Sequence, residues 1–302
     1  MKLNGKRIIV TGGAGFIGSN LLKHLINEKT EVLVLDNLFT GKKEFIPPEV
    51  QFKNIDIRSD EIKEIIKDFK PDNIIHLAAI HYIPYCNENP EETFDVNVMG
   101  TRNILEASQG IDFFFASSAA VYPPLDGPLD ENIIGPMDVY GKTKLIGEDL
   151  VRLYAKNAII GRFFNAYGPN ETNPHLIPEI IDQILCGNNS IELGNLSPKR
   201  DYIHVDDICS AIISLLKSNN PGVYNIGTGN EYSVTEIVDA ISQILDRNIE
   251  IIQDPKRMRK VEREHLLADI TTIQKIGWNP KESIYKGLNS LITAQINLYD
   301  NI

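Results

Sequence analysis

The sequence predicts an α/β fold in which a doubly wound parallel sheet is joined to a smaller C-terminal α/β portion. Two observations predict the sheet. Short apolar runs alternate with helical patterns through the first half of the 302-residue chain, and a glycine-rich turn separates the first apolar run from the first helical pattern. A third observation predicts the second portion, because loop chemistry interrupts this alternation beyond about residue 165.

Strands are predicted where apolar and β-branched residues stand together, and helices where apolar residues recur every three or four positions. Strands that alternate with helices of this length pair in parallel. Right-handed crossovers then place helices on both faces of one sheet. The predicted strands are Arg7–Thr11, Glu31–Leu35, Asn73–Ala78, Asp112–Ser117 and Ala158–Phe163, and the predicted helices are Gly15–Asn27, Glu61–Asp68, Thr93–Ser108 and Asp138–Lys156.

The second portion begins with the turn-forming residues Gly168-Pro169-Asn170 and continues with further helical patterns. The predicted division is a sheet domain over residues 1–165, to which about 200–229 return, and a smaller portion over about 166–199 and 230–302. Doubly wound sheets bind ligands at the carboxyl ends of their strands, so a cleft between the two parts is the expected site. The further predicted helices are Ile177–Leu185, Ile203–Leu216 and Val234–Leu245.

The composition excludes several classes of function. A net charge of −11 disfavours binding to nucleic acid and to anionic membranes, so neither is an expected partner. No apolar run is long enough to span a bilayer, and the first residues carry no signal-peptide pattern. The three cysteines are widely spaced and odd in number, which indicates reduced thiols in a cytoplasmic protein. The six histidines show no ligand spacing, so no metal site is expected.

One basic cluster departs from the acidic balance of the chain. It contains Lys256, Arg257, Arg259, Lys260 and Arg263. The charges alone indicate either a solvated loop or a local anion site for a phosphorylated substrate.

The glycine-rich turn predicts a dinucleotide site in a Rossmann-type domain. Gly13-Ala14-Gly15-Phe16-Ile17-Gly18 matches G-x-G-x-x-G, and it stands between a predicted strand and a predicted helix, as the motif requires. Glycine permits the tight turn and lets backbone N–H groups approach a pyrophosphate at the positive end of the helix. Asp36 ends the second apolar run, 18 residues beyond Gly18. Its carboxylate would bind the adenosine ribose and repel a 2′-phosphate, which favours NAD over NADP, although Lys42 and Lys43 stand nearby.

Tyr140 and Lys144 are candidate catalytic residues because they lie four apart, and so on one face, of a predicted helix. A tyrosine hydroxyl ordinarily titrates near pH 10, and an adjacent ammonium is expected to lower its pKa. Ser117 and Ser118 end the preceding strand, where a hydroxyl can donate to a reacting oxygen.

These residues together resemble the extended short-chain dehydrogenase/reductase family, in its NAD-dependent nucleotide-sugar epimerase/dehydratase branch. The resemblance runs almost end to end. It is carried by Thr11–Leu21, Asp36–Gly41, Asp56-Ile57, His76–Ala79, Asn97–Ala107, Ser117–Tyr122, Tyr140–Lys144, Arg162–Pro169, Arg200–Asp207, Asn225–Gly229, Ala268-Asp269 and Gly277-Trp278.

The resemblance implies a role for each matching position. Ser118, Tyr140 and Lys144 would form the catalytic triad. Tightly bound NAD, regenerated in each turnover, would contact Gly12, Gly15, Phe16, Ile17, Gly18, Asp36, Asn37, Thr40, Gly41, Asp56, Ile57, Leu77, Ala78, Ala79, Asn97, Tyr140, Lys144 and Phe164. A nucleotide-diphosphate sugar would contact His81, Ser118, Asn165, His175, Arg200 and Arg259, and the two arginines suit a diphosphate because guanidinium pairs with phosphate bidentately.

The matching segments are more specific for the family than for the reaction, and the chain most resembles the UDP-glucose 4-epimerase type, which oxidises the sugar to a 4-keto intermediate and returns the hydride. Dehydratases of the branch place acidic residues just after the catalytic serine, whereas this chain has Ala119 and Ala120, whose methyl groups cannot move protons. The segment Asp254–Asp269 nevertheless resembles the tails of GDP-sugar dehydratases. A 4,6-dehydratase, a decarboxylase, a 4-keto reductase and a non-catalytic NAD-binding regulator therefore stay open as alternatives.

Three further expectations follow from the resemblance. His81 stands where 4-epimerases often carry Lys or Gln, so it either contacts substrate or packs locally. Leu266 aligns with a position that can gate the width of the pocket. The family commonly dimerises through two helices per subunit, here Thr93–Ser108 and Asp138–Lys156, so a homodimer is expected, with Leu145, Leu150, Leu153 and Tyr154 offering apolar surface.

Overall fold

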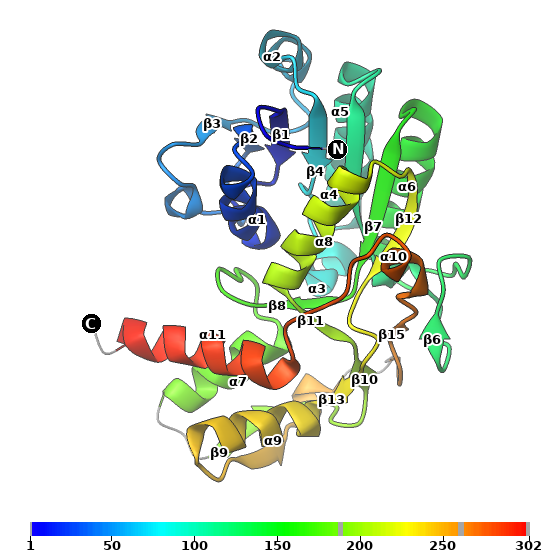
Figure 1. The fold of residues 1–302 in the computed structure, drawn as a ribbon. Coiled ribbons are helices and arrows are strands. Elements are labelled where there is room, and N and C mark those ends of the chain that lie inside the picture. Colours follow the sequence, from blue (N-terminus) through cyan, green and yellow to red (C-terminus); the bar gives the residue numbers. More distant parts are fainter. Residues whose placement is uncertain (1, 187–189, 259–262, 300–302) are drawn as a thin grey trace.

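The computed structural model describes residues 2–186, 190–258 and 263–299, and its centre is one seven-stranded parallel sheet (Figure 1). The strand order is β12-β7-β5-β4-β1-β2-β3. The order reverses between β1 and β4, which is where such sheets bind ligands. The expected doubly wound α/β class is confirmed. The strands of this sheet are β1 (Arg7–Thr11), β2 (Glu31–Asp36), β3 (Gln51–Asn54), β4 (Asn73–His76), β5 (Asp112–Ser118), β7 (Ala158–Phe163) and β12 (Gly222–Ile226).

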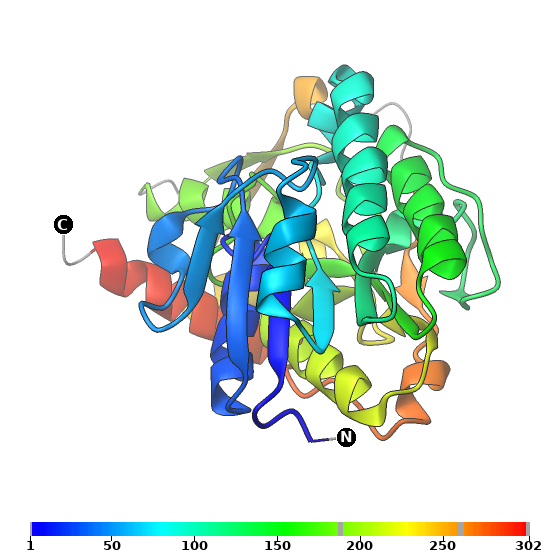
Figure 2. The ribbon, with the colours of Figure 1, turned by 90° about the horizontal axis from the view of Figure 1, so that it is seen from above.

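Helices cover both faces of the sheet because both faces of its strands are apolar. On one face, α1 and α8 pack together over residues such as Ile8, Val10 and Val34. On the other face, α2, α5 and α6 cover Ile9, Ile74 and their neighbours, and Figure 2 shows α5 and α6 side by side. These helices are α1 (Phe16–Asn27), α2 (Ile62–Phe69), α5 (Thr101–Ala107), α6 (Val139–Tyr154) and α8 (Val205–Ser218).

Two predicted helices differ from the structure. The predicted helix Thr93–Ser108 is divided into α4 (Pro90–Phe94), a π-helical turn (Asp95–Gly100) and α5, and the π turn brings Asn97 inward. The predicted helix Ile203–Leu216 begins later than expected, since Tyr202–His204 forms strand β11, which pairs with β8 (Asn165–Tyr167). A three-residue strand is too short to show the alternation that would have identified it.

The C-terminal portion has its own hydrophobic cluster, with Ile180, Ile191, Ile237 and Leu288 fully buried at its centre. This cluster lies below the sheet in Figure 1. The cluster joins helices that are far apart in the chain. They are α7 (Leu176–Leu185), α9 (Val234–Leu245) and α11 (Ile284–Tyr299), and the paired strands β9 (Ser190–Leu193) and β14 (Glu250–Gln253) pack with them.

Within the described ranges, no helix combines the length and the hydropathy that a bilayer span requires.

Candidate active site

A large cavity, with a volume of about 1160 Å³, lies between the carboxyl ends of the central strands and the C-terminal portion. Pockets for one drug-sized ligand usually have volumes of roughly 300–1,000 Å³, so this one suits two ligands side by side. Most residues predicted for the site line it. They are Gly12, Gly15, Phe16, Ile17, Gly18, Asp36, Asn37, Thr40, Gly41, Ile57, Leu77, Ala78, Ala79, His81, Ser118, Tyr140, Lys144, Phe164, Asn165, His175 and Arg200, together with Leu266.

The glycine turn is closed so tightly that two of its glycines admit no side chain. A Cβ at Gly18 would stand 2.2 Å from the carbonyl oxygen of Gly12, and one at Gly12 would stand 2.7 Å from the backbone nitrogen of Ala78. Helix α1 begins just beyond, with Gly15 as its N-cap, no side-chain cap and no acidic residue in its first turn. The first N–H groups of this helix therefore face the cavity without a competing carboxylate. The turn fits a pyrophosphate.

Asp36 stabilises the turn as well as lining the cavity. Its Oδ2 accepts a hydrogen bond of 2.9 Å from the backbone N–H of Ala14, and its Oδ1 accepts one of 2.8 Å from that of Leu38. Burial raises the pKa of Asp36, and these two bonds oppose that rise. The carboxylate stands at the end of β2, where an adenosine ribose would meet it.

Ser118 and helix α6, which carries Tyr140 and Lys144, approach each other through a glycine. Ser118 ends β5, and its Oγ accepts a hydrogen bond of 3.1 Å from the N–H of Ala120 in the 3₁₀ turn that follows. Gly141 allows α6 to contact that turn, because a Cβ there would stand 2.3 Å from the carbonyl oxygen of Ala120. Asp138 caps α6 by accepting a hydrogen bond of 2.7 Å from the N–H of Gly141. The first turn of α6, which carries Tyr140, is thus held against the end of β5.

Lys144 is almost fully buried, and its Nζ donates a hydrogen bond of 2.8 Å to the carbonyl oxygen of Ala116. Its Nζ lies 5.7 Å from the centre of the Tyr140 ring. Burial lowers the pKa of Lys144 to about 8. The expected lowering of the Tyr140 pKa is wrong for the protein by itself: burial raises that pKa, and a hydrogen bond with Ser118 opposes the rise only in part. Desolvation of the phenolate is the largest cause of the rise, and the charges of Cys86 and Asp138 add to it.

On the side of the cavity that faces the C-terminal portion, the histidines belong to a hydrogen-bonded cluster. His81 Nε2 lies 3.1 Å from Asn173 Nδ2, so Asn173 donates and the ring accepts. Burial lowers the pKa of His81 to about 4, which makes the ring neutral at physiological pH. His175 Nδ1 lies 3.1 Å from Glu171 Oε2. The Glu171 side chain is nearly buried and lines the cavity, although the sequence pattern did not single it out.

Two arginines link the C-terminal portion to the site. Arg200 Nη1 donates to the carbonyl oxygen of Arg263 at 2.8 Å. Arg263 in turn donates to the carbonyl oxygens of Ala119 and Ala120, each at 3.2 Å. Arg263 and Arg257 both line the cavity, so part of the basic cluster faces the site. Within the basic cluster, the sequence predicted a substrate contact for Arg259 alone, and Arg259 lies outside the described residues.

Two residues predicted to contact NAD are not among those that line the cavity. Asp56 is held by Arg58, whose Nε and Nη2 donate to its two oxygens at 2.8 Å each. Asn97 is buried, and its amide bonds to both backbone groups of Ile80 and to Thr143. For these two side chains the expected contact with the cofactor stays a prediction, since the groups they bond to here are those of the protein. Arg58 lines the cavity instead.

Known proteins resemble this chain across most of its length. The model of the NAD-dependent epimerase/dehydratase family matches residues 8–227. A putative UDP-glucose 4-epimerase of Methanocaldococcus jannaschii is 36% identical, over 96% of this chain and 98% of the relative. The crystal structure of Thermus thermophilus UDP-glucose 4-epimerase in complex with NAD has a TM-score of 0.87 and 29% identity, covering 95% of this chain and 98% of the other. That of the Thermotoga maritima UDP-glucose 4-epimerase with UDP-glucose has a TM-score of 0.90 and 28% identity, covering 97% and 99%.

Proposed function

The chain belongs to the NAD-dependent epimerase/dehydratase family and is an NAD-dependent nucleotide-sugar epimerase, and we propose that its substrate is a UDP-hexose, inverted at C4. The observation that carries the proposal is one cavity that joins the glycine turn to Ser118, Tyr140 and Lys144. Ala119 and Ala120 follow the catalytic serine and offer no group for the proton transfers of a dehydration.

The proposed reaction assigns each residue of the triad a task. NAD, held by the glycine turn and Asp36, would supply a hydride acceptor and a positive charge that favours the Tyr140 phenolate. Tyr140 takes the proton of the C4 hydroxyl as the C4–H bond breaks, and Ser118 donates a hydrogen bond to the resulting keto oxygen. Lys144 holds positive charge beside both. Once the keto sugar has turned its other face towards the cofactor, Tyr140 would give the proton back, so that C4 would be inverted with no net oxidation.

Substrate contacts are proposed for the residues that line the far side of the cavity. Arg200 would bind the diphosphate. The sequence predicted the same role for Arg259. Asn165, His175 and Glu171 line the wall beside the sugar. His81 would instead connect the segment after β4 to the loop that contains Asn173, because its Nε2 already accepts a hydrogen bond from Asn173.

The test is to incubate the purified protein with UDP-, GDP-, CDP- and dTDP-sugars and to follow C4 by NMR. Interconversion of UDP-glucose and UDP-galactose without added cofactor is expected, since NAD stays bound. A persistent 4-keto-6-deoxy product would instead identify a dehydratase. Turnover only with added reducing cofactor would identify a reductase.

Tyr140→Phe is the matched control for this test. It keeps the ring but removes the proton-transferring oxygen, so kcat should fall by about 10²–10⁴-fold with NAD still bound. Unchanged turnover in this variant would contradict the assigned role.

We further propose a homodimer built on α6 and on α5 with the π turn before it. Leu153 is 76% exposed on α6, and Ile146 and Met99 are also exposed, whereas Leu145, Leu150 and Tyr154 pack within the subunit. Leu153→Asp should therefore shift the protein towards the monomer in analytical ultracentrifugation. The proposed division into an NAD-binding part and a sugar-binding part keeps its predicted boundaries. A cytoplasmic location is proposed because the three cysteines are free thiols.

A further inference from the structure

A buried ion pair lies behind the catalytic residues. Arg162 on β7 and Glu148 on α6 have no exposed side-chain surface, and they meet bidentately, with Nε–Oε1 and Nη2–Oε2 distances of 2.8 Å. Neither residue is among those that line the cavity. Their role is therefore separate from contact with either ligand.

On one side, the pair contacts the strand end that carries Ser118. The Oγ of Ser117 donates a hydrogen bond of 2.6 Å to Glu148 Oε1. Glu148 also lies one helical turn beyond Lys144 and two turns beyond Tyr140, on the same face of α6. One carboxylate, carried by the helix of the other two catalytic residues, thus bonds to the strand that carries the catalytic serine.

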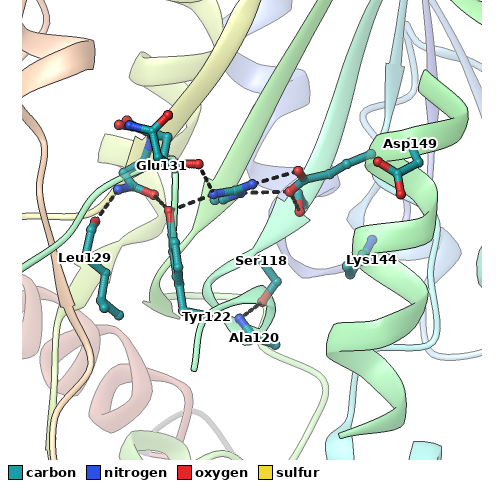
Figure 3. Close-up of polar contacts among 12 residues, drawn as sticks. Ser118, Ala120, Tyr122, Leu129, Glu131, Lys144 and Asp149 are labelled. Atoms are coloured by element: carbon teal, nitrogen blue, oxygen red, sulfur yellow. Dashed lines mark hydrogen bonds and ion pairs between the residues drawn. The ribbon is translucent and has the colours of Figure 1, made fainter. Parts of the chain in front are cut away.

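On its other side, the guanidinium holds the loop that follows Ser118. Arg162 Nη1 donates to the hydroxyl of Tyr122 at 3.1 Å and to the carbonyl oxygen of Glu131 at 2.8 Å. The Tyr122 hydroxyl donates to Asn225, whose amide donates to the carbonyl oxygen of Leu129 at 2.7 Å. Figure 3 shows this chain of contacts running past Tyr122 and Leu129, with Ser118 and Lys144 beside it.

The energetics of such a pair favour a geometric role over a stabilising one. Removing two charges from water costs about as much free energy as their attraction returns, and apolar residues of similar volume often stabilise a fold equally well. The pair fixes the orientation of β7 relative to α6, because a bidentate guanidinium and a carboxylate meet in one plane.

We infer that Glu148 and Arg162 are positioning residues, which fix the distance and orientation between Ser118 at the end of β5 and the Tyr140–Lys144 face of α6. The inference rests on the proposed epimerisation and deepens it. It predicts that loss of the pair lowers the rate of the chemical step more than it lowers substrate binding.

Glu148 also acts on Lys144 through its charge. The titratable groups around Lys144 are Tyr140 and Glu148 on α6, Cys86 on α3 (Ile83–Glu88), His76 on β4, and His81. Burial lowers the pKa of Lys144, whereas Cys86 and Glu148 raise it. Loss of the carboxylate should therefore move the titration of Lys144 to lower pH.

The first experiment is the neutral pair Glu148→Gln with Arg162→Gln, which removes both charges and keeps polar atoms for Ser117 and Tyr122. We expect kcat to fall about 10- to 100-fold, as displacements of catalytic groups by an ångström do, with KM within twofold and NAD retained. Arg152→Ala is the matched control, since it removes only the exposed partner of Glu148, and it should leave kcat near that of wild type. A folded neutral pair with wild-type kcat would overturn the inference.

A second variant keeps the inference testable if the neutral pair does not fold. Ser117→Ala removes only the hydrogen bond from the strand end to Glu148. Its kcat should fall several-fold with KM unchanged. Wild-type kcat in a folded Ser117→Ala protein would count against the inference.

A readout without turnover separates this inference from the proposed function. NMR titration of labelled lysines in the NAD-loaded protein should show Lys144 titrating at lower pH in Glu148→Gln, which removes the carboxylate alone, than in wild type. An identical Lys144 titration in both proteins would overturn the inference. Failure of wild type to convert any UDP-sugar would overturn the proposed function instead, and the lysine titration would still report on the pair.

Discussion

Gly141 on α6 lies directly against the carbonyl oxygen of Ala120, and a Cβ added at Gly141 would stand 2.3 Å from that oxygen. Real side chains do not approach a backbone oxygen so closely. The residue after Tyr140 must therefore be small for the tyrosine to reach the turn that follows Ser118.

Gly141→Ala should displace the first turn of α6 from this contact. We expect kcat to fall by about 10²-fold, because catalytic groups misplaced by an ångström lose roughly that much. The neighbouring Lys142 is exposed, and Lys142→Ala should retain wild-type kcat. Steady-state kinetics with UDP-galactose would measure both. Equal rates in the two variants would mean that the close contact has no bearing on catalysis.

Two glycines of the cofactor turn should respond differently to the same substitution. Gly18→Ala forces its methyl into the Gly12 carbonyl at 2.2 Å, so both thermal stability and NAD content should fall. Gly15→Ala meets the Gly12 carbonyl only at 3.4 Å, which is an ordinary contact, so the fold should keep its stability. Its methyl would nevertheless stand on the cavity wall and weaken NAD binding.

Calorimetry and the absorbance of released cofactor distinguish these glycine variants. A Gly15→Ala protein that unfolds at a much lower temperature than wild type would contradict the prediction that only Gly18 is needed for stability.

Asp36→Asn should weaken the discrimination between NAD and NADP. The amide keeps an acceptor for one of the backbone N–H groups of Ala14 and Leu38 but removes the charge that repels a 2′-phosphate. We expect the preference for NAD to fall about tenfold, which corresponds to roughly 1.4 kcal/mol. Lys43→Ala is the control, because its ammonium lies over the Phe52 ring. Competition binding with both coenzymes would test this, and an unaltered preference in Asp36→Asn would assign the selectivity to another group.

His76 should make the fold sensitive to acid. The ring is fully buried between the hydroxyls of Thr11 and Thr101, at 2.7 and 2.9 Å, and burial lowers its pKa to about 3. The unfolded chain binds a proton near pH 6.5, whereas the folded chain does not, so stability is complete above pH 6.5 and falls as the pH drops towards 3. The slope from this one group is about 1.4 kcal/mol per pH unit.

His76→Gln should remove this component of the pH dependence, because glutamine has no charge to gain. Urea unfolding of both proteins between pH 7 and pH 4 measures it. Parallel stability curves for wild type and variant would show that His76 takes up no proton on unfolding.

The parts of the site that residue patterns alone predicted are the local ones, whereas Asn165, His175 and Arg200 were named through the family resemblance. The glycine turn and the spacing of Tyr140 and Lys144 each lie within one strand–turn–helix segment, so periodicity alone fixes their relative placement. Arg263 and Glu171 were not predicted because their positions depend on contacts across the fold. Arg263 reaches a turn more than 140 residues away in the chain. The sign of the Tyr140 pKa shift depends on how much water the folded chain excludes, which no residue pattern records.

The place of β12 in the sheet has a consequence for how the protein is made. This strand, Gly222–Ile226, pairs with β7 at the edge of the sheet, although a long segment that includes α7 and α8 separates the two in the chain. A nascent chain that has emerged only as far as β7 exposes an unpaired, apolar strand edge, which is a template for aggregation. Fragments that end near residue 165 should therefore need chaperones or precipitate, while those that extend past 229 should be recovered in the supernatant.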